Sequence, residues 1–161
     1  MDSKKLSEAI QKAISEVVGN KKMSLDLAKK VSEKIREKAK EIGVNAVVAI
    51  SDEGARPILV ECMDDSYIAS YDIAVNKAYT TVALKMSTKT LKGLAQPGQS
   101  LYGIQFTNNS KIVIFGGGET LDAFGKILGG LGVSGGTEEQ DTYLAEYGKE
   151  VFKKIIEERS F

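Results

Sequence analysis

Few side chains in this sequence could carry out chemistry of their own. The 161 residues include no histidine, which is the commonest general base and a common metal ligand, so most familiar catalytic constellations are excluded. Cys62 is the only cysteine, which excludes an intramolecular disulfide and a cysteine-based zinc cluster. Because Cys62 alternates with Ile58 and Val60, we expect it to be buried as a small apolar residue rather than to act as a nucleophile.

The remaining candidates are acidic pairs and a set of methionines and tyrosines. Asp64-Asp65 and Glu138-Glu139 lie at predicted turns or helix starts, where a capping role is favoured over proton transfer. Thioethers and phenols could ligate iron or line a flat apolar cofactor, although at helical spacing they usually belong to a core. The residues concerned are Met63, Met86, Tyr67, Tyr71 and Tyr79. We therefore expect a binding protein with no catalytic residue of its own.

One glycine-rich segment matches the dinucleotide-binding pattern G-x-G-x-x-G. It runs from Gly130 to Gly135, between a predicted strand and a predicted helix. A dinucleotide site also needs a further parallel strand ending in an acidic residue, and none follows before Phe161. We interpret these glycines as positions where a strand approaches another backbone closely and then turns into a helix.

Composition and charge narrow the class of protein further. Lysine and arginine number 22, as do aspartate and glutamate, so the formal net charge is zero and nucleic acid is not expected as a partner. The sequence holds neither an apolar run of the ~20 residues needed to cross a bilayer nor a secretory leader. We expect a cytoplasmic chain with no membrane segment and one folded domain.

Periodicity predicts helices alternating with short strands. Apolar residues recur every three or four positions in four segments, with a short helix between the third and the last. The predicted helices cover residues 3–18, 24–42, 66–86, 87–93 and the region from Thr137 onward. For the helix at 66–86 we expect Ile68, Tyr71, Ala74, Val75, Ala78 and Val82 on the inner face.

Runs of β-branched residues between glycine-rich turns predict about five strands. They are expected at residues 44–51, 58–63, 111–115, 119–121 and 126–133. The short connection between the first two favours an antiparallel hairpin, and residues 94–110 have the composition of a loop that could border a site. Helices flanking a mainly antiparallel sheet make the predicted fold α+β.

Three segments give the sequence a family resemblance over roughly residues 23–158. The residues that carry it are Asp52, Gly54, Met63-Asp64, Ala74, Lys77-Ala78, Thr80, Thr88, the run from Gly129 to Gly136, and Gln140-Asp141. In these the chain resembles the GlcG/HbpS family, which includes the carboxy-terminal domain of PduO-type propanediol-utilisation proteins. Cys62 stands where the family often has arginine, and Asp65 replaces a usual glycine.

The resemblance implies a profilin-like α/β/α fold over residues 23–161 that assembles into homo-oligomers, dimers or larger. It also implies binding of haem or a related tetrapyrrole beside a cobalamin-linked pathway such as propanediol or glycolate catabolism. Because the sequence has no histidine, the ligand of a haem iron would have to be Met, Tyr, Cys, Thr or Lys. Otherwise the protein would contact only the porphyrin. The cofactor-binding residues implied are Met63, Asp64, Tyr71, Lys77, Thr81, Met86 and Thr88.

Residues 1–22 lie outside the family resemblance. Their short amphipathic helix and polar linker are similar to the encapsulation peptides that carry enzymes into bacterial microcompartments, which would place the chain in the compartment lumen. The apolar residues Leu6, Ile10, Ile14 and Val17 would then dock in a groove on a shell protein. The alternative is an extra helix packed on the domain or at a subunit interface.

Three functions therefore stay open. The first is a tetrapyrrole-binding accessory module. The second is a structural or interaction protein of a microcompartment, and the third is an enzyme associated with corrinoid adenosylation. The third ranks lowest, because the resemblance places that activity in the other domain of PduO-type proteins.

Overall fold

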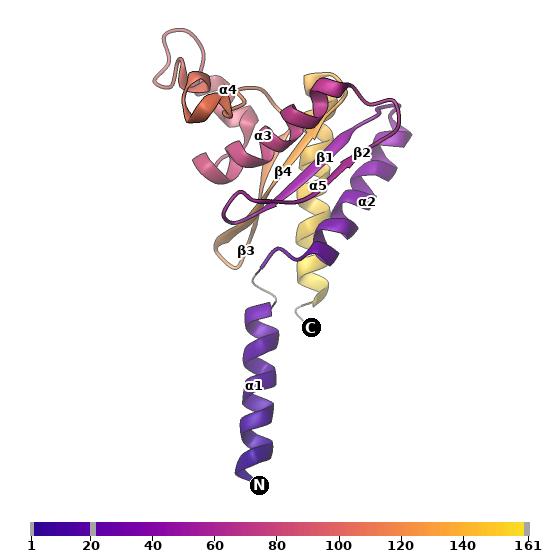
Figure 1. Cartoon of the computed structure of the whole chain (residues 1–161), viewed down its shortest axis with the longest axis vertical. Helices are drawn as coiled ribbons and strands as arrows, with labels where there is room; N and C mark the ends of the chain where they lie inside the picture. Colours follow the sequence, from indigo (N-terminus) through magenta and orange to yellow (C-terminus); the bar gives the residue numbers. More distant parts are fainter. Residues whose placement is uncertain (1, 20–21, 160–161) are drawn as a thin grey trace.

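A computed structural model describes residues 2–19 and 22–159 (Figure 1). Five α-helices, two 3-10 turns and four strands follow one another in that part of the chain. The helices are α1 (Ser3–Gly19), α2 (Leu25–Glu41), α3 (Ile68–Leu84), α4 (Thr88–Leu94) and α5 (Glu138–Arg159). The strands are β1 (Val47–Asp52), β2 (Pro57–Cys62), β3 (Gly118–Ala123) and β4 (Lys126–Ser134), and the 3-10 turns are Ile104–Phe106 and Asn108–Ser110. The predicted α+β class is confirmed.

The sheet is antiparallel throughout, in the order β2-β1-β4-β3. The predicted hairpin of β1 and β2 is present, with Ala49 opposite Val60. The expected fifth strand at residues 111–115 is wrong. The Val113 amide donates to Thr80 Oγ1 at 3.0 Å instead of joining a ladder, so this segment is fastened to α3 by a side chain.

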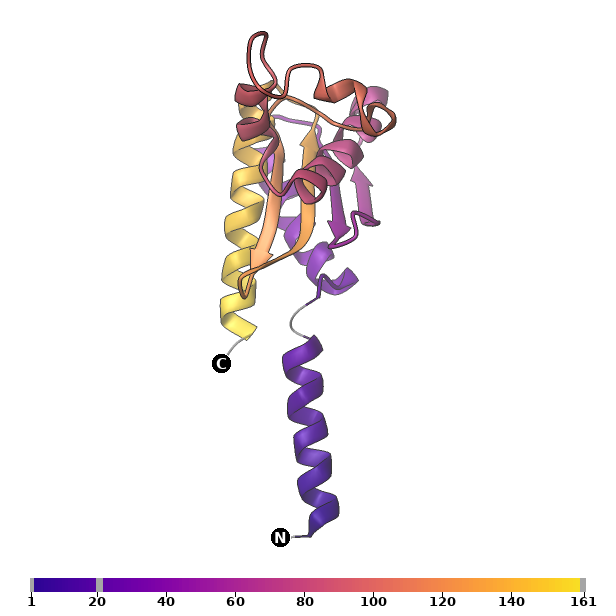
Figure 2. The ribbon, with the colours of Figure 1, turned by 90° about the vertical axis from the view of Figure 1, so that its left-hand side faces the viewer.

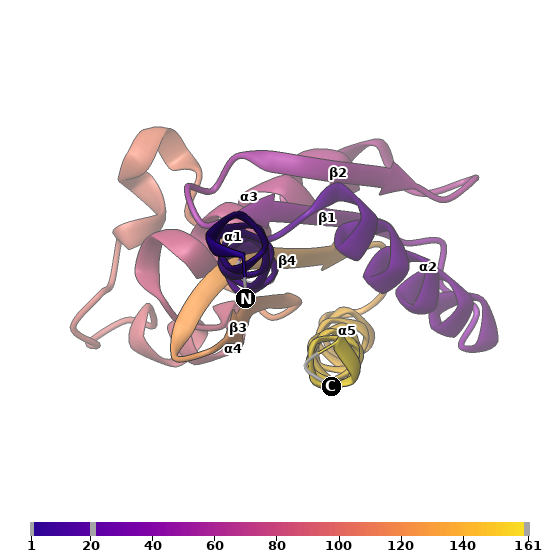
Figure 3. The same cartoon turned by 90° about the horizontal axis from the view of Figure 1, so that it is seen from below.

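Helices cover both faces of the sheet, as Figure 3 shows from below. On one face α2 and α5 lie side by side and bury the main core. The apolar residues that recur at helical spacing in α2 face this core, since Ala28, Val31, Ile35 and Ala39 are all fully buried there. Ser24 caps α2 by accepting the Leu27 amide at 3.1 Å, which satisfies one of the free donors at a helix start.

On the other face α3 lies close against β1 and β4. Its contact is built from small residues, Val47, Ala49, Ala74 and Ala78. A Cβ placed on Gly132 would overlap the backbone carbonyl of Ala74. The glycine-rich segment of β4 therefore serves close backbone approach, as we interpreted it, because only glycine leaves room for the helix.

Two predictions about burial are wrong on this α3 face. Ile68 and Tyr71 are 97% and 54% exposed, so they lie outside the contact with the sheet. Cys62 is also exposed. The common reason is that α3 makes most of its sheet contacts with β1, β3 and β4, which leaves the edge strand β2 largely uncovered on that face.

The amino-terminal helix α1 stands apart from the sheet and its covering helices (Figure 2). Leu6 and Ile10 are about half exposed. The side chains of Ile14 and Val17 lie outside the described residues. None of the helices in the described ranges is long and apolar enough to span a bilayer.

Candidate functional site

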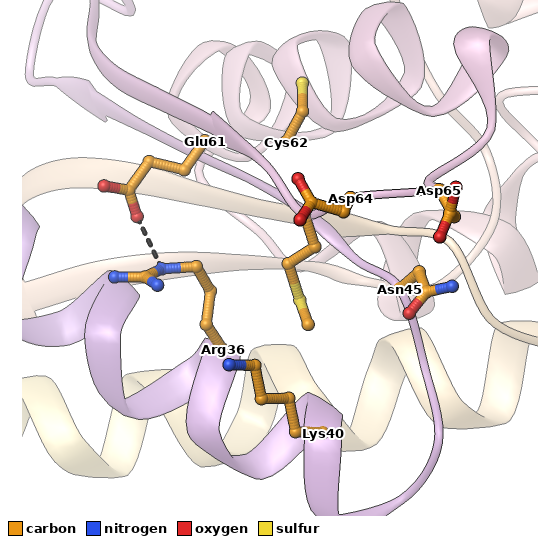
Figure 4. A pocket seen from close by; sticks show the side chains of 8 residues that line it. Arg36, Lys40, Asn45, Glu61, Cys62, Asp64 and Asp65 are labelled. Atoms are coloured by element: carbon orange, nitrogen blue, oxygen red, sulfur yellow. Dashed lines mark ion pairs between the residues drawn. The ribbon is translucent and has the colours of Figure 1, made fainter.

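An open cavity of about 520 Å³ lies where β2 ends and the chain turns toward α3 (Figure 4). Its walls come from the last two turns of α2, the connection from α2 to β1, the end of β2 and the three residues that follow β2. The lining residues are Arg36, Lys40, Asn45, Glu61, Cys62, Met63, Asp64 and Asp65. Its volume is within the range usual for small-molecule sites. Two of the seven predicted cofactor-binding residues, Met63 and Asp64, lie in it.

Two cations from one side of α2 face the cavity. Arg36 and Lys40 are one helical turn apart, which places them on the same helix face. Arg36 Nε lies 2.7 Å from Glu61 Oε2, but its N–H is not aligned for a hydrogen bond. Ser32 Oγ donates to the same carboxylate oxygen at 2.6 Å. Lys40 has no ion-pair partner among the described residues, so the cavity offers a cation to an acidic ligand.

The two sulfur atoms of the cavity differ in their availability. Met63 is half-buried, and its Sδ accepts a hydrogen bond from the Ala46 amide at 3.3 Å. Because a thioether is a weak acceptor, a partner that binds the sulfur more strongly could replace this amide. Cys62 is exposed, and Figure 4 shows its thiol pointing away from Arg36 and Lys40. Met63 packs against the core under α2, the helix that carries the cations, so its thioether is the soft donor on that side.

A second group of predicted residues lies beneath α3, where Lys77 is fully buried. Its ammonium donates to the Val133 carbonyl at 2.8 Å and to Asp141 Oδ2 at 3.2 Å, and it lies 5.1 Å from the centre of the Phe115 ring. Burial lowers the pKa of Lys77, and burial raises the pKa of Asp141. All these partners belong to the protein, so Lys77 joins α3, β4 and α5.

The two buried threonines also have protein partners. Thr81 Oγ1 donates to the Ala78 carbonyl at 2.9 Å. Thr88 Oγ1 accepts the Gly118 amide at 2.9 Å, which holds the start of β3 against α4. The structure thus divides the predicted set: Met63 and Asp64 share the cavity, and Lys77, Thr81 and Thr88 are interior. Tyr71 is exposed on α3, and Met86 follows the end of that helix.

Sequence reasoning missed the two cations of the cavity. Their spacing was the available signal, because Arg36 and Lys40 are four residues apart and lie beside the predicted apolar side of α2. What the sequence could not give was the meeting of α2 with the end of β2. Within the described ranges, three or more carboxylate or thiol side chains nowhere gather closely enough to hold a metal ion. The cavity itself brings the cations Arg36 and Lys40 beside the carboxylates of Glu61, Asp64 and Asp65.

Comparison with known proteins gives a consistent result. Residues 23–150 match the family model described as haem degrading protein HbpS-like. An uncharacterized 15.0 kDa protein from the dhaT-dhaS intergenic region of Citrobacter freundii is 44% identical over 133 residues, which cover 83% of this chain and 94% of that protein.

A second relative is an enzyme of the same organism. The corrinoid adenosyltransferase PduO is 41% identical over 109 residues, which cover 68% of this chain but 32% of PduO. Among solved structures, the crystal structure of a PduOC–haem complex superposes with a TM-score of 0.78 at 35% identity, covering 81% of this chain and 94% of that one.

Proposed function

The chain belongs to the HbpS-like family, and from that premise we propose that it binds haem or a related tetrapyrrole in the cavity at the end of β2. The observation that carries this proposal is the meeting of two cations with a thioether. Arg36 and Lys40 suit the propionate groups of haem, because a guanidinium and an ammonium both bind carboxylates. Met63 would supply the iron ligand by giving up its contact with the Ala46 amide.

Relatives support the choice of ligand. PduOC, which is 35% identical to this chain, has been crystallised as a complex with haem. A related domain occupies about a third of a corrinoid adenosyltransferase, which supports an accessory role beside a cobalamin-linked pathway. Bound haem would supply redox or ligand-exchange chemistry at its iron. The role of Arg36 and Lys40 would be to hold and orient the edge of the haem that carries the propionate groups.

Titration of the purified protein with haemin, and separately with cobalamin, tests the proposal. We expect a stoichiometric shift of the Soret band with haemin. Met63→Leu should move the Soret maximum, whereas Met86→Leu, at the far end of α3, should not. Lys40→Glu should weaken binding about tenfold or more, because it places a like charge beside a carboxylate. Lys29→Glu, on the same helix outside the cavity, is the matched control.

Several outcomes would contradict the proposal. If haemin causes no spectral change, the protein does not bind haem. If cobalamin binds stoichiometrically instead, the ligand of the cavity is a corrinoid. If Lys29→Glu weakens binding as much as Lys40→Glu, the effect is one of general charge and the cavity is not the site. Steady loss of the Soret band under a reductant would mean turnover of haem, which a binding-only role does not allow.

A second function is favoured by α1. The family model begins at residue 23, and α1 exposes Leu6 and Ile10 while standing apart from the domain. We propose that this helix docks its apolar side in a groove of a microcompartment shell protein. A reporter fused to residues 1–22 should form foci in a compartment-forming host, and Leu6→Glu with Ile10→Glu should disperse them. Diffuse fluorescence of the unmodified fusion would contradict docking to a shell protein. Helix α1 would then be a helix that packs on the domain or at a subunit interface.

We also propose that the chain forms homo-oligomers. The exposed apolar side chains at the start of α3, Tyr67, Ile68 and Tyr71, support this, because exposed apolar surface of this kind is typical of association sites. Sedimentation of the full chain over a range of concentrations measures it. A single monomeric species at all concentrations would contradict self-association and leave the proposals for the cavity and for α1 unchanged.

A further inference from the structure

Helix α3 carries a second row of apolar side chains, which is exposed at the start of the helix and half-buried from Val75 onward. We call it the α3 stripe, and its residues are Ile68, Tyr71, Val75, Tyr79 and Val82. They follow one another at spacings of three and four, so they form one continuous row along the helix. Ile68 is 97% exposed and Tyr71 is 54% exposed. Isolated apolar residues on a surface need no explanation, but a row along a whole helix does.

Charges are distributed unequally along this row. At its beginning lie the exposed carboxylates of Asp65 and Asp72. Near its end lie the exposed ammonium groups of Lys85 and Lys111, and that of Lys111 is 5.4 Å from the centre of the Tyr79 ring. Within the described part of the chain none of these four residues has an ion-pair partner. The stripe is therefore acidic at one end and basic at the other.

We infer that α3 packs antiparallel against α3 of a second copy of the chain, across a two-fold axis at Val75; this inference rests on the proposed self-association. Antiparallel packing about that residue brings Ile68 to Val82 of the partner subunit and Tyr71 to Tyr79 of the partner subunit. A two-fold contact uses the same surface on both copies, so the pattern must be complementary to itself. Because the stripe has one acidic end and one basic end, only an antiparallel pair of helices is complementary to itself.

The same orientation also pairs the charges. Asp65 comes opposite Lys85 of the partner subunit, and Asp72 comes beside Lys111 of the partner subunit, which lies over the Tyr79 ring. Each pair occurs twice in the dimer because of the symmetry. A parallel pair of helices would instead place carboxylate against carboxylate and ammonium against ammonium. Complementary charge of this kind fixes orientation and partner more than it adds affinity.

The contact extends beyond the helix to the neighbouring strand. Val60 of β2 and Val75 of α3 are both half-buried and pack on the same cluster beneath α3, so the stripe is continuous with the uncovered face of β2. A second α3 seated on the stripe would cover both. The interface then resembles the helix-on-sheet packing of the domain itself, with apolar side chains in the centre and charges at the rim.

Sedimentation equilibrium of the full chain and its variants tests the surface. Ile68→Glu should weaken dimer formation at least about tenfold without loss of fold, because Ile68 makes few contacts within its own chain. Asp72→Lys and Lys111→Asp should each weaken the dimer, and the double variant should restore it. Both positions have right-handed backbone, so the exchange does not strain the chain. Glu139→Lys, an exposed change on α5, is the matched control.

Crosslinking gives an independent measurement. Val75→Cys in a Cys62→Ser background should form a disulfide-linked dimer on mild oxidation, since the two copies of residue 75 meet at the axis. Lys126→Cys in the same background, at the exposed first residue of β4, should not. If the chain associates but neither Ile68→Glu nor the charge variants change its Kd, the surface is wrong. A chain that never associates contradicts the proposed self-association itself.

Discussion

The two faces of the sheet are covered by different kinds of packing. Under α2 and α5 the side chains are large, with Ile35, Leu144 and Phe152 fully buried among them. Under α3 they are alanine, glycine and threonine, and the largest buried side chain there is that of Lys77. The first face stabilises the domain by the amount of apolar surface removed from water. The second depends on close backbone approach and paired polar groups, and it leaves the outer side of α3 uncovered.

The largest effect should come from the apolar face. Phe152→Ala removes a fully buried ring and should lower the free energy of unfolding by about 4 kcal/mol, because lost burial and the remaining cavity add together. Denaturant unfolding measures it. Phe124→Ala, at a half-exposed ring in the turn between β3 and β4, is the control and should cost far less. Equal losses would mean that the core is not concentrated under α2 and α5.

The polar centre under α3 comes next. Lys77→Met leaves Asp141 buried without its cation and should cost about 3 kcal/mol at neutral pH. Burial raises the pKa of Asp141, so the loss should shrink as the pH falls and that carboxyl takes up a proton. The double variant Lys77→Met with Asp141→Asn should recover much of the stability. A double variant as unstable as the single one would show that the pair is not acting as a unit.

The close approach of the α3 and β4 backbones can be tested by adding one Cβ atom at Gly132. Gly132→Ala adds a methyl group that overlaps the Ala74 carbonyl, so α3 must move away from β4, and we expect a loss of about 2 kcal/mol. Gly93→Ala is the contrasting variant, because its added Cβ meets no atom within 4 Å in a helical segment, and it should stabilise slightly. Thermal unfolding compares the two. A neutral Gly132→Ala would mean that α3 is not held closely.

The smallest expected effect concerns the border between the two faces. Glu138 accepts the Gly116 amide at 2.9 Å and pairs with Lys92, and together these hold the pKa of its carboxyl below the usual value. A lowered pKa stabilises the fold above the ordinary value of about 4.3, and this contribution is lost as the pH falls through the folded-state pKa. Glu138→Gln should cost about 0.5 to 1 kcal/mol at pH 7 and less below pH 4.

Acid titration of stability compares Glu138→Gln with Glu139→Gln, its exposed neighbour. The neighbour should follow the unmodified chain at all pH values. If both variants lose stability equally, the effect belongs to the charge of the helix start rather than to the Gly116 contact.

The apolar face could be read from the sequence, and the α3 face could not. The side of α2 that carries Val31 and Ile35 repeats at helical spacing. The start of α5 carries the capping-box pattern of Thr137 and Gln140, in which the Thr137 amide donates to Gln140 Oε1 and the Gln140 amide donates to Thr137 Oγ1. In α3, apolar residues occur on two sides of the helix. Periodicity therefore predicts Ile68 and Tyr71 on the inner side, whereas the buried residues of α3 are alanine, serine, threonine and Lys77.

The candidate site was predictable only in part for a related reason. Met63 and Asp64 follow a recognisable strand, but Lys77 gives no sign of burial until Asp141, 64 residues later, is placed beside it. Cys62 alternates correctly with Val60, and the alternation cannot tell a central strand from an edge strand. Neighbours in space, rather than residue type, decide which of these groups faces the cavity and which is buried.

The positions of the two chain ends have a practical meaning. Helix α2 begins, and α5 finishes, at the end of the domain that lies away from the cavity at the last turns of α2 (Figure 1). Material attached after Arg159 would project on that side, so an affinity tag or a sensor-chip tether there would keep the cavity facing the solution. A second chain joined there would leave the proposed binding cavity uncovered.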